Sequence, residues 1–135
     1  MALLYSAINA GLVVLIWLVQ IIIYPGMHGW DQARFAELHK NYATRMSFIV
    51  GPLMLGQAAM ALHQLIALPD GAAVVQILLI GGVWGVTIFI SVPLHRRLTG
   101  GYEERTVNRL VATNWLRTVG WSLVFLLDML RWAKT

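Results

Sequence analysis

The chain contains no cysteine and few charged residues. Charged residues make up 12% of its 135 residues and hydrophobic residues 59%, whereas an average soluble domain is roughly 25% charged and about 45–50% apolar. The lack of cysteine excludes a disulfide scaffold, a zinc site with thiolate ligands and a cysteine nucleophile. The shortage of charge excludes a soluble monomer and a disordered chain, because too few polar side chains remain to cover a hydrated surface. One membrane domain fits this length and composition.

Four long hydrophobic runs take the place of the missing charge. Each is about as long as the ~20 residues that cross a bilayer core, and lipid forces such a run to satisfy its backbone hydrogen bonds as a helix. We therefore predict an all-α fold, a four-helix transmembrane bundle in which residues 1–135 form a single domain. The predicted spans cover residues 2–24, 46–68, 72–94 and 107–130. Gly81 and Gly85 form a small-xxx-small step, which predicts close helix contact within the bundle or between subunits of an oligomer.

The connection between the first two spans is long enough to hold a helix of its own. Within residues 30–42, Phe35, Leu38 and Tyr42 recur at helical spacing, and charged residues occupy the other positions. This pattern predicts a short helix that lies in the membrane interface between spans 1 and 2.

Basic residues are concentrated in two of the three connections. The first and third connections hold seven of them: Arg34, Lys40, Arg45, Arg96, Arg97, Arg105 and Arg109. The opposite side has only Arg131 and Lys134. The positive-inside rule then places both long connections in the cytoplasm and both termini outside. No basic stripe is interleaved with exposed aromatic residues, so we expect membrane lipid and not nucleic acid as a partner.

Arg117 is the most informative polar residue inside a span. It lies roughly 15 Å into the bilayer, where an arginine costs about 2.5–3.5 kcal/mol to insert. The acid in its span, Asp128, is eleven residues further on, or about 16 Å along the helix axis. Arg117 must therefore meet neutral acceptors, water or an anionic ligand, and we predict that it faces the bundle interior beside Asn114. Its other expected neighbours are polar groups of the first or third span, namely Gln20, Thr87 or Ser91.

Three histidines fall at the predicted cytoplasmic ends of three different segments. His28 follows the first span, His39 precedes the second and His95 ends the third. They are candidate catalytic residues for proton transfer, candidate ligands of a divalent metal, and, taken as a pair, candidate axial ligands of haem. Their spacing matches no metal motif, and the alternative is that they are hydrogen-bonding caps at the interface.

The remaining candidate ligand-binding residues lie in the same layer or just below it. Tyr24, Tyr42 and Arg45 share the layer of the histidines, and Ser91, Asn114 and Arg117 lie deeper. Neighbouring helices pack 8–10 Å apart, so these side chains can converge on one point. We predict one polar pocket that opens to the cytoplasm, narrows toward Arg117 and has a basic rim. The rim residues are Arg96 and Arg97.

Several short motifs carry a family resemblance over most of the chain. They are Tyr24-Pro25-Gly26-Met27-His28, the spaced set Phe35, His39, Tyr42 and Arg45-Met46-Ser47, then Pro52-Leu53-Met54, Val92-Pro93-Leu94-His95 and Asn114-Trp115-Leu116-Arg117-Thr118. They resemble an uncharacterised family of short bacterial four-helix membrane proteins. The resemblance implies the fold and a bacterial cytoplasmic membrane, and it implies no activity.

Two further groups of small membrane proteins show a looser likeness. The chain is similar to the short membrane protoporphyrinogen oxidases, which contain haem, and to anthrone-oxygenase-like proteins, which can carry a similar Asn-Trp-x-Arg-Thr element. The first span holds no histidine, whereas those oxidases would hold haem there.

Three classes of function fit these observations. The first is a redox or oxygenase-like membrane enzyme that acts on an apolar small molecule with an anionic or carbonyl group, with haem or a divalent metal as candidate cofactor. The second is a non-enzymatic subunit or lipid-binding scaffold of a larger membrane complex. The third is a small transporter, although no pair of broken helices marks a midplane transport site.

Overall fold

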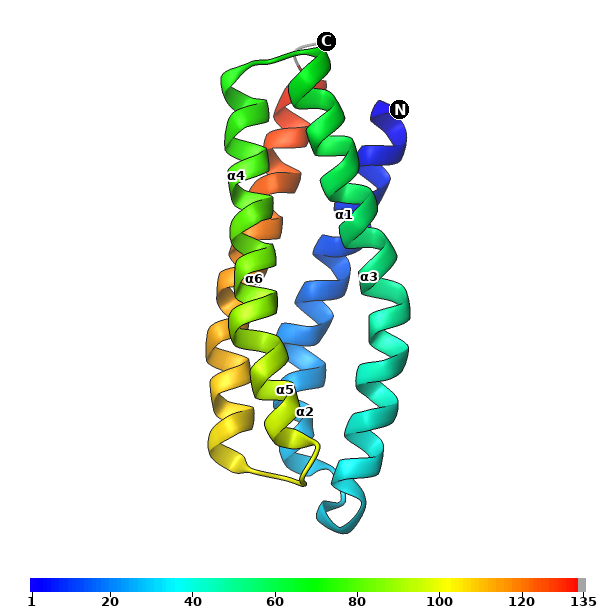
Figure 1. The fold of residues 1–135 in the computed structure, drawn as a ribbon, viewed down its shortest axis with the longest axis vertical. Coiled ribbons are helices and arrows are strands. Elements are labelled where there is room, and N and C mark those ends of the chain that lie inside the picture. The colour runs from blue at the N-terminus through cyan, green and yellow to red at the C-terminus, as the bar shows by residue number, and fades with distance from the viewer. Residues whose placement is uncertain (134–135) are drawn as a thin grey trace.

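The computed structural model describes residues 1–133 and contains helices and no strand in that range. The elements are α1 Ala2–Leu18, η1 Val19–Ile23, α2 Tyr24–Gly26, η2 Met27–Gly29, η3 Gln32–Arg34, α3 Phe35–Ala67, α4 Gly71–Val86, η4 Thr87–Ser91, α5 Val92–Leu98 and α6 Glu104–Trp132. They form four long rods packed side by side (Figure 1). Each rod is long and apolar enough to cross a membrane, with bounds Ala2–Gly29, Gln32–Ala67, Gly71–Leu98 and Glu104–Trp132. The all-α four-helix bundle is confirmed.

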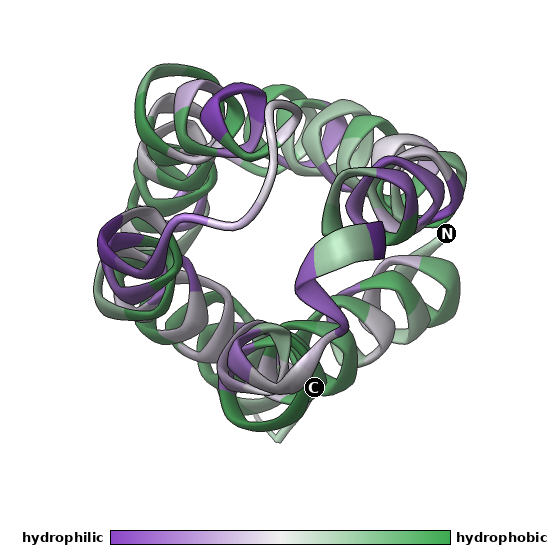
Figure 2. Ribbon diagram, turned by 90° about the horizontal axis from the view of Figure 1, so that it is seen from below, coloured by the Kyte–Doolittle hydropathy of each residue, from purple (hydrophilic) through white to green (hydrophobic). Residues whose placement is uncertain are grey.

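Polar and apolar residues are distributed as in a protein that lipid surrounds. Large apolar side chains point outward, and Phe48 and Phe89 are each 77% exposed. Polar side chains are buried between the helices, among them Asn9, Gln57 and Arg117. Viewed end-on, the helices form a ring (Figure 2). A soluble bundle would place these groups the other way round.

The two ends of the bundle are easy to tell apart. The N-terminus and the end of α6 lie together at one end (Figure 1), where the Trp132 indole donates a 2.7 Å hydrogen bond to Ser6. The connections formed by residues 27–34 and 99–103 lie at the opposite end, which we call the rim end. This arrangement is that of an even number of passes. Lys134, one of the two basic residues predicted to lie on the side opposite the basic connections, is outside the described residues.

The prediction of a separate interfacial helix is wrong. Helical structure is present from Phe35 onward, but α3 continues without a break for 33 residues to Ala67. A helix of that length spans about 50 Å, so its first turns extend beyond the hydrocarbon core. Neither glycine nor proline interrupts residues 35–50, so nothing separates the amphipathic part from the span.

The first and third rods share a local irregularity, a π-helical turn that is followed by a proline. η1 and η4 are π-helical turns, and each is followed within two residues by a proline, Pro25 or Pro93. Proline lacks the N–H that would continue the regular ladder, and π turns are frequent at functional sites. The turns place Tyr24 and His95, which follow them, toward each other.

Close helix contact occurs at a different glycine from the predicted pair. A Cβ atom built on Gly81 or Gly85 would meet nothing within 4 Å, so these residues do not bring helices of this bundle together. A Cβ on Gly120 would lie 2.7 Å from Cγ2 of Val83. The glycine that lets α4 and α6 approach is therefore Gly120.

Candidate functional site

Arg117 faces the bundle interior, as predicted, and is 7% exposed. Its Nε and Nη2 donate to Oδ1 of Asn114 at 2.9 and 2.7 Å. Nη2 also donates to the Tyr24 hydroxyl at 3.1 Å, and Nη1 donates to Oγ1 of Thr87 at 3.4 Å. Residues of the first, third and fourth rods thus hold one guanidinium, and every acceptor is neutral.

Gln20 fixes the orientation of Asn114. Its Oε1 accepts hydrogen bonds from Nδ2 of Asn114 at 2.9 Å and from Oγ1 of Thr118 at 3.0 Å. Its Nε2 donates to the Val111 carbonyl at 3.0 Å. Because the Asn114 amide group gives its N–H to Gln20, its carbonyl oxygen is turned toward Arg117.

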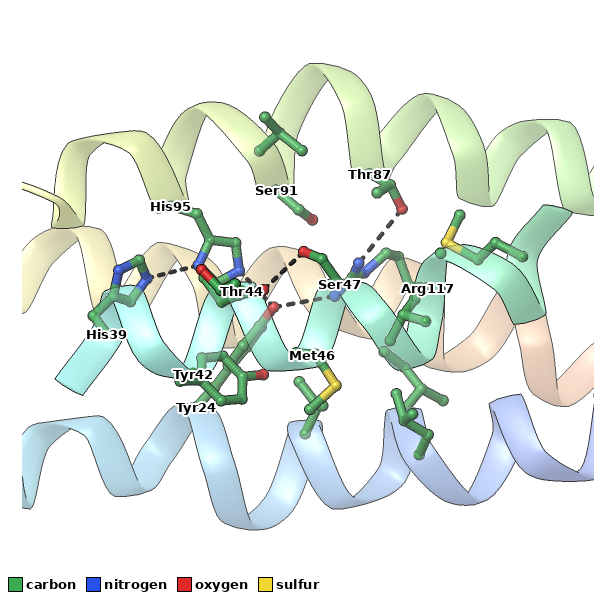
Figure 3. Close-up of a pocket in the computed structure, with 18 of the residues that line it drawn as sticks. Tyr24, His39, Tyr42, Thr44, Met46, Ser47, Thr87, Ser91, His95 and Arg117 are labelled. Carbon is green, nitrogen blue, oxygen red and sulfur yellow. Dashed lines mark hydrogen bonds between the residues drawn. The ribbon is translucent and has the colours of Figure 1, made fainter. Parts of the chain in front are cut away.

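A chain of four side chains leads from Arg117 to the rim end (Figure 3). The Tyr24 hydroxyl, which accepts from Arg117, lies 2.9 Å from Nε2 of His95. Nδ1 of His95 lies 2.9 Å from Nε2 of His39, and the two rings stack with centroids 5.1 Å apart. His39 is 1% exposed, and its Nδ1 is buried without a partner among the described residues. The chain therefore ends in a buried ring nitrogen that forms no hydrogen bond within the described residues.

A cavity of about 470 Å³ borders this chain. Tyr24, His39, His95 and Arg117 contribute to its polar wall, together with Ser91. The rest of the lining is mostly apolar and includes Ile16, Val19, Met46, Val50 and Met54. A volume of this size fits a drug-sized apolar ligand, and polar groups gathered on one side would fix its orientation.

Within the described residues, the cavity is lined by positively charged side chains and by no acid. All charged residues that line it are cations: Lys40, Arg96 and Arg117. Asp128 is 4% exposed and accepts from Nδ2 of Asn9 at 3.1 Å, in a different network. Within residues 1–133, Arg117 has no carboxylate partner. A buried cation without a counter-ion favours a ligand oxygen that carries or develops negative charge.

Not all predicted site residues come together. Six of them line the cavity: Tyr24, His39, Tyr42, Ser91, His95 and Arg117. Asn114 does not line it but accepts a hydrogen bond from Arg117. Arg45 is exposed on α3 and does not line it. His28 is also exposed, and its Nδ1 lies 2.7 Å from the Tyr102 hydroxyl. Of the predicted basic rim, Arg96 lines the cavity and Arg97 does not.

The predicted three-histidine metal site is not formed. No three His, Cys, Asp or Glu side chains in the described part of the chain are grouped to hold a metal ion, because His28 points to Tyr102 and only the other two imidazoles meet. Axial ligands of one haem stand on opposite faces of the macrocycle. Since His39 and His95 are in direct hydrogen-bond contact at 2.9 Å, the pair leaves no room for a haem between them.

A second buried network occupies the other half of the bundle. The Trp121 indole donates to Oε1 of Gln57 at 3.0 Å, and Nε2 of Gln57 donates to Oδ1 of Asn9 at 2.8 Å. Asn9 in turn donates to Asp128. Trp121 joins this network to the cavity, since its ring centroid lies 5.9 Å from Cζ of Arg117. Sequence reasoning did not assign Gln57, although an amide inside an apolar run was a signal that could have found it.

The fold and this site define a multi-pass helical membrane protein with a largely apolar cavity that is bordered by Arg117, Tyr24 and two histidines. No protein-family model, curated protein or solved structure matches the chain.

Proposed function

We propose that the protein is a membrane enzyme that binds an apolar carbonyl compound in the cavity and transfers a proton at its carbonyl group. One observation carries this proposal. The Arg117 guanidinium and the Tyr24 hydroxyl, 3.1 Å apart, both border the cavity, and Tyr24 continues into two histidines.

Arg117 would stabilise negative charge on the carbonyl oxygen. A neutral carbonyl gains little from a nearby cation, whereas an enolate oxygen gains a great deal in a dry site. The interaction therefore grows as the reaction proceeds, which is the requirement for catalysis. Asn114 keeps the guanidinium in place through its two contacts at 2.9 and 2.7 Å.

Tyr24 would supply the proton. Its O–H bond breaks as the carbonyl oxygen gains the proton. A water molecule in the cavity takes the proton of the adjacent C–H bond, and the electrons of that bond form the C=C bond of an enol. Tyr24 then takes the proton from Nε2 of His95, and His95 takes one at Nδ1 from Nε2 of His39. His39 gains at Nδ1, which has no partner among the described residues, the proton that the water took from the C–H bond, so the cycle closes with no net change in the chain. A positioned general acid of this kind contributes roughly 10²–10⁴-fold.

Redox or oxygenase-like chemistry on the same ligand is a further proposal, since an enolate is the electron-rich form of a carbonyl compound. We place the rim end in the cytoplasm of a bacterial inner membrane, with both termini outside, because seven basic residues lie near that end and follow the positive-inside rule.

Deuterium exchange provides the test. The purified protein in phosphatidylcholine nanodiscs is incubated in D₂O with 2-tridecanone, and deuterium gained beside the carbonyl is measured by mass spectrometry. We expect faster exchange than in empty nanodiscs. Tyr24→Phe should lower the rate by roughly 10²-fold or more. Tyr5→Phe is the matched control, because Tyr5 is also buried but does not line the cavity. Exchange no faster than in empty nanodiscs would contradict the proposal.

A scaffold or subunit role is the second candidate, and one surface favours it. Gly81 is exposed, and neither Gly81 nor Gly85 has a neighbour within 4 Å of its Cβ position. This small-xxx-small surface is free to receive a helix of another subunit. The size of the purified protein in nanodiscs, before and after Gly81→Leu, distinguishes a self-associating chain from a monomer.

A further inference from the structure

The cavity is long. Its lining residues on α3 run from His39 to Met54, which is about 22 Å along the helix axis. Its lining on the third rod and the turn after it runs from Thr87 to Thr99. A ligand that fills the cavity therefore extends along the helix axes, as a hydrocarbon chain can.

The mouth of the cavity lies along the side of the bundle. Exposed lining residues come from α3 and from α5 with the turn that follows it: Lys40, Thr44 and Ser47 on one side, and Val92, Arg96 and Thr99 on the other. Both helices belong to candidate membrane spans. A molecule already dissolved in the lipid leaflet would thus enter sideways between them, without crossing water.

Charge is placed at two levels along the cavity. Lys40 and Arg96 are exposed at the rim end, and Arg117 is buried further in. Thr87, which accepts from Arg117, precedes Arg96 by nine residues on the same rod. The two levels are therefore about 13 Å apart along the axis, or roughly ten carbon–carbon bonds of an extended chain.

We propose that the ligand is a single-chain lipid whose anionic end binds Lys40 and Arg96 and whose keto oxygen, roughly ten bonds along the chain, binds Arg117 and Tyr24. The inference depends on the proposed function, because it names the substrate class of the same site. A cation pair at the leaflet surface attracts an anionic head, the long cavity accommodates an extended chain, and the deeper donors select the position of the oxygen.

A set of keto fatty acids measures the spacing directly. Octadecanoic acids with the ketone at carbon 4, 10 or 16 are equilibrated with the protein in phosphatidylcholine nanodiscs, and bound ligand is counted by mass spectrometry against empty nanodiscs. We expect the 10-oxo acid to bind at least about tenfold more tightly than the other two. The Lys40→Gln and Arg96→Gln double variant should weaken its binding by about tenfold, whereas Arg97→Gln, at an exposed residue outside the cavity, should not.

The outcomes separate this inference from the function on which it depends. If the methyl ester of the 10-oxo acid binds as tightly as the acid, the anionic head is overturned while ketone binding at Arg117 stands. If plain octadecanoate binds through Arg117 and ignores Lys40 and Arg96, the orientation is overturned. If the three keto acids bind equally and Arg117→Leu has no effect on them, both the inference and the proposed function fail.

Discussion

The Tyr24 hydroxyl lies 3.1 Å from Nη2 of Arg117 and 2.9 Å from Nε2 of His95, so one oxygen joins the deep cation to the imidazoles of the rim end. Because Arg117 can only donate, Tyr24 accepts from it and keeps its own proton for either His95 or a ligand. The same hydroxyl therefore has two hydrogen-bond arrangements. The choice between them depends on whether an acceptor occupies the cavity.

His39 should matter to proton transfer and His28 should not. His39→Ala removes the last member of the chain, and we expect ketone exchange to fall by about tenfold or more, since the general acid is then no longer reprotonated efficiently. Free imidazole added to the variant should restore part of the rate. His28→Ala is the control, because His28 contacts Tyr102 and does not line the cavity. Equal losses in the two variants would remove His39 from the proton path.

Arg117→Leu distinguishes a ligand-binding arginine from a structural one. The change leaves Oδ1 of Asn114 without a donor, which costs about 1–3 kcal/mol, and removes the insertion cost of a buried arginine, about 2.5–3.5 kcal/mol. These effects nearly cancel, so the free energy of unfolding should change by less than about 2 kcal/mol while ketone exchange is lost. Arg45→Leu, at an exposed residue outside the cavity, should retain the exchange. A variant with Arg117→Leu that fails to fold would instead mark the residue as a structural tie between rods.

The surroundings of Arg117 could be predicted because its burial has a known cost. A charge in a span must find partners, and the only candidates at its depth were polar residues of the neighbouring spans. The orientation of Arg45 could also have been found. Asn41, Arg45 and Phe48 follow one another at steps of four and three residues, so they share one face of α3, and all three are exposed and absent from the cavity lining.

Other features leave little trace in the sequence. The π turns before Pro25 and Pro93 change the helical phase by one residue, and no residue pattern distinguishes such a turn from an ordinary proline kink. Because of this change in helical phase, Tyr24 faces His95. His28 lies beyond the π turn and outside the cavity. The interfacial helix was misjudged for a related reason. The sequence shows where the polar residues of the connection give way to the apolar run, but not whether a helix ends at that boundary.

The network in the other half of the bundle should contribute to stability. Asp128→Leu would leave Nδ2 of Asn9 buried without its acceptor, and we expect the free energy of unfolding to fall by about 1–3 kcal/mol. Asp128→Asn is the matched variant, because its amide oxygen can still accept from Asn9 and the loss should be smaller. Thermal unfolding in nanodiscs compares the two. If both variants lose equal stability, the negative charge itself matters and not the hydrogen bond at 3.1 Å.

Gly120→Ala should weaken the contact between α4 and α6. The added Cβ would lie 2.7 Å from Cγ2 of Val83, so a side chain or a helix must move. Overpacking of this kind typically costs about 1–3 kcal/mol. Gly81→Ala is the control in α4, because its Cβ would meet nothing within 4 Å, and we expect it to be neutral or slightly stabilising. Unfolding in graded denaturing detergent measures both. A stable Gly120→Ala protein would show that the two helices are free to separate.

Cysteine labelling decides the orientation of the bundle. The chain has no native cysteine, so single cysteines can be introduced at Ala2 and at Glu103, which lie at opposite ends and are exposed. Gly101 is avoided because its φ of 127° strains any other residue. The positive-inside rule predicts that a membrane-impermeant maleimide added to intact cells labels the cysteine at position 2 and reaches position 103 only after lysis. Lys40→Cys, exposed at the rim end, should behave like position 103. Labelling of position 103 but not position 2 in intact cells would invert the topology and place the mouth in the outer leaflet.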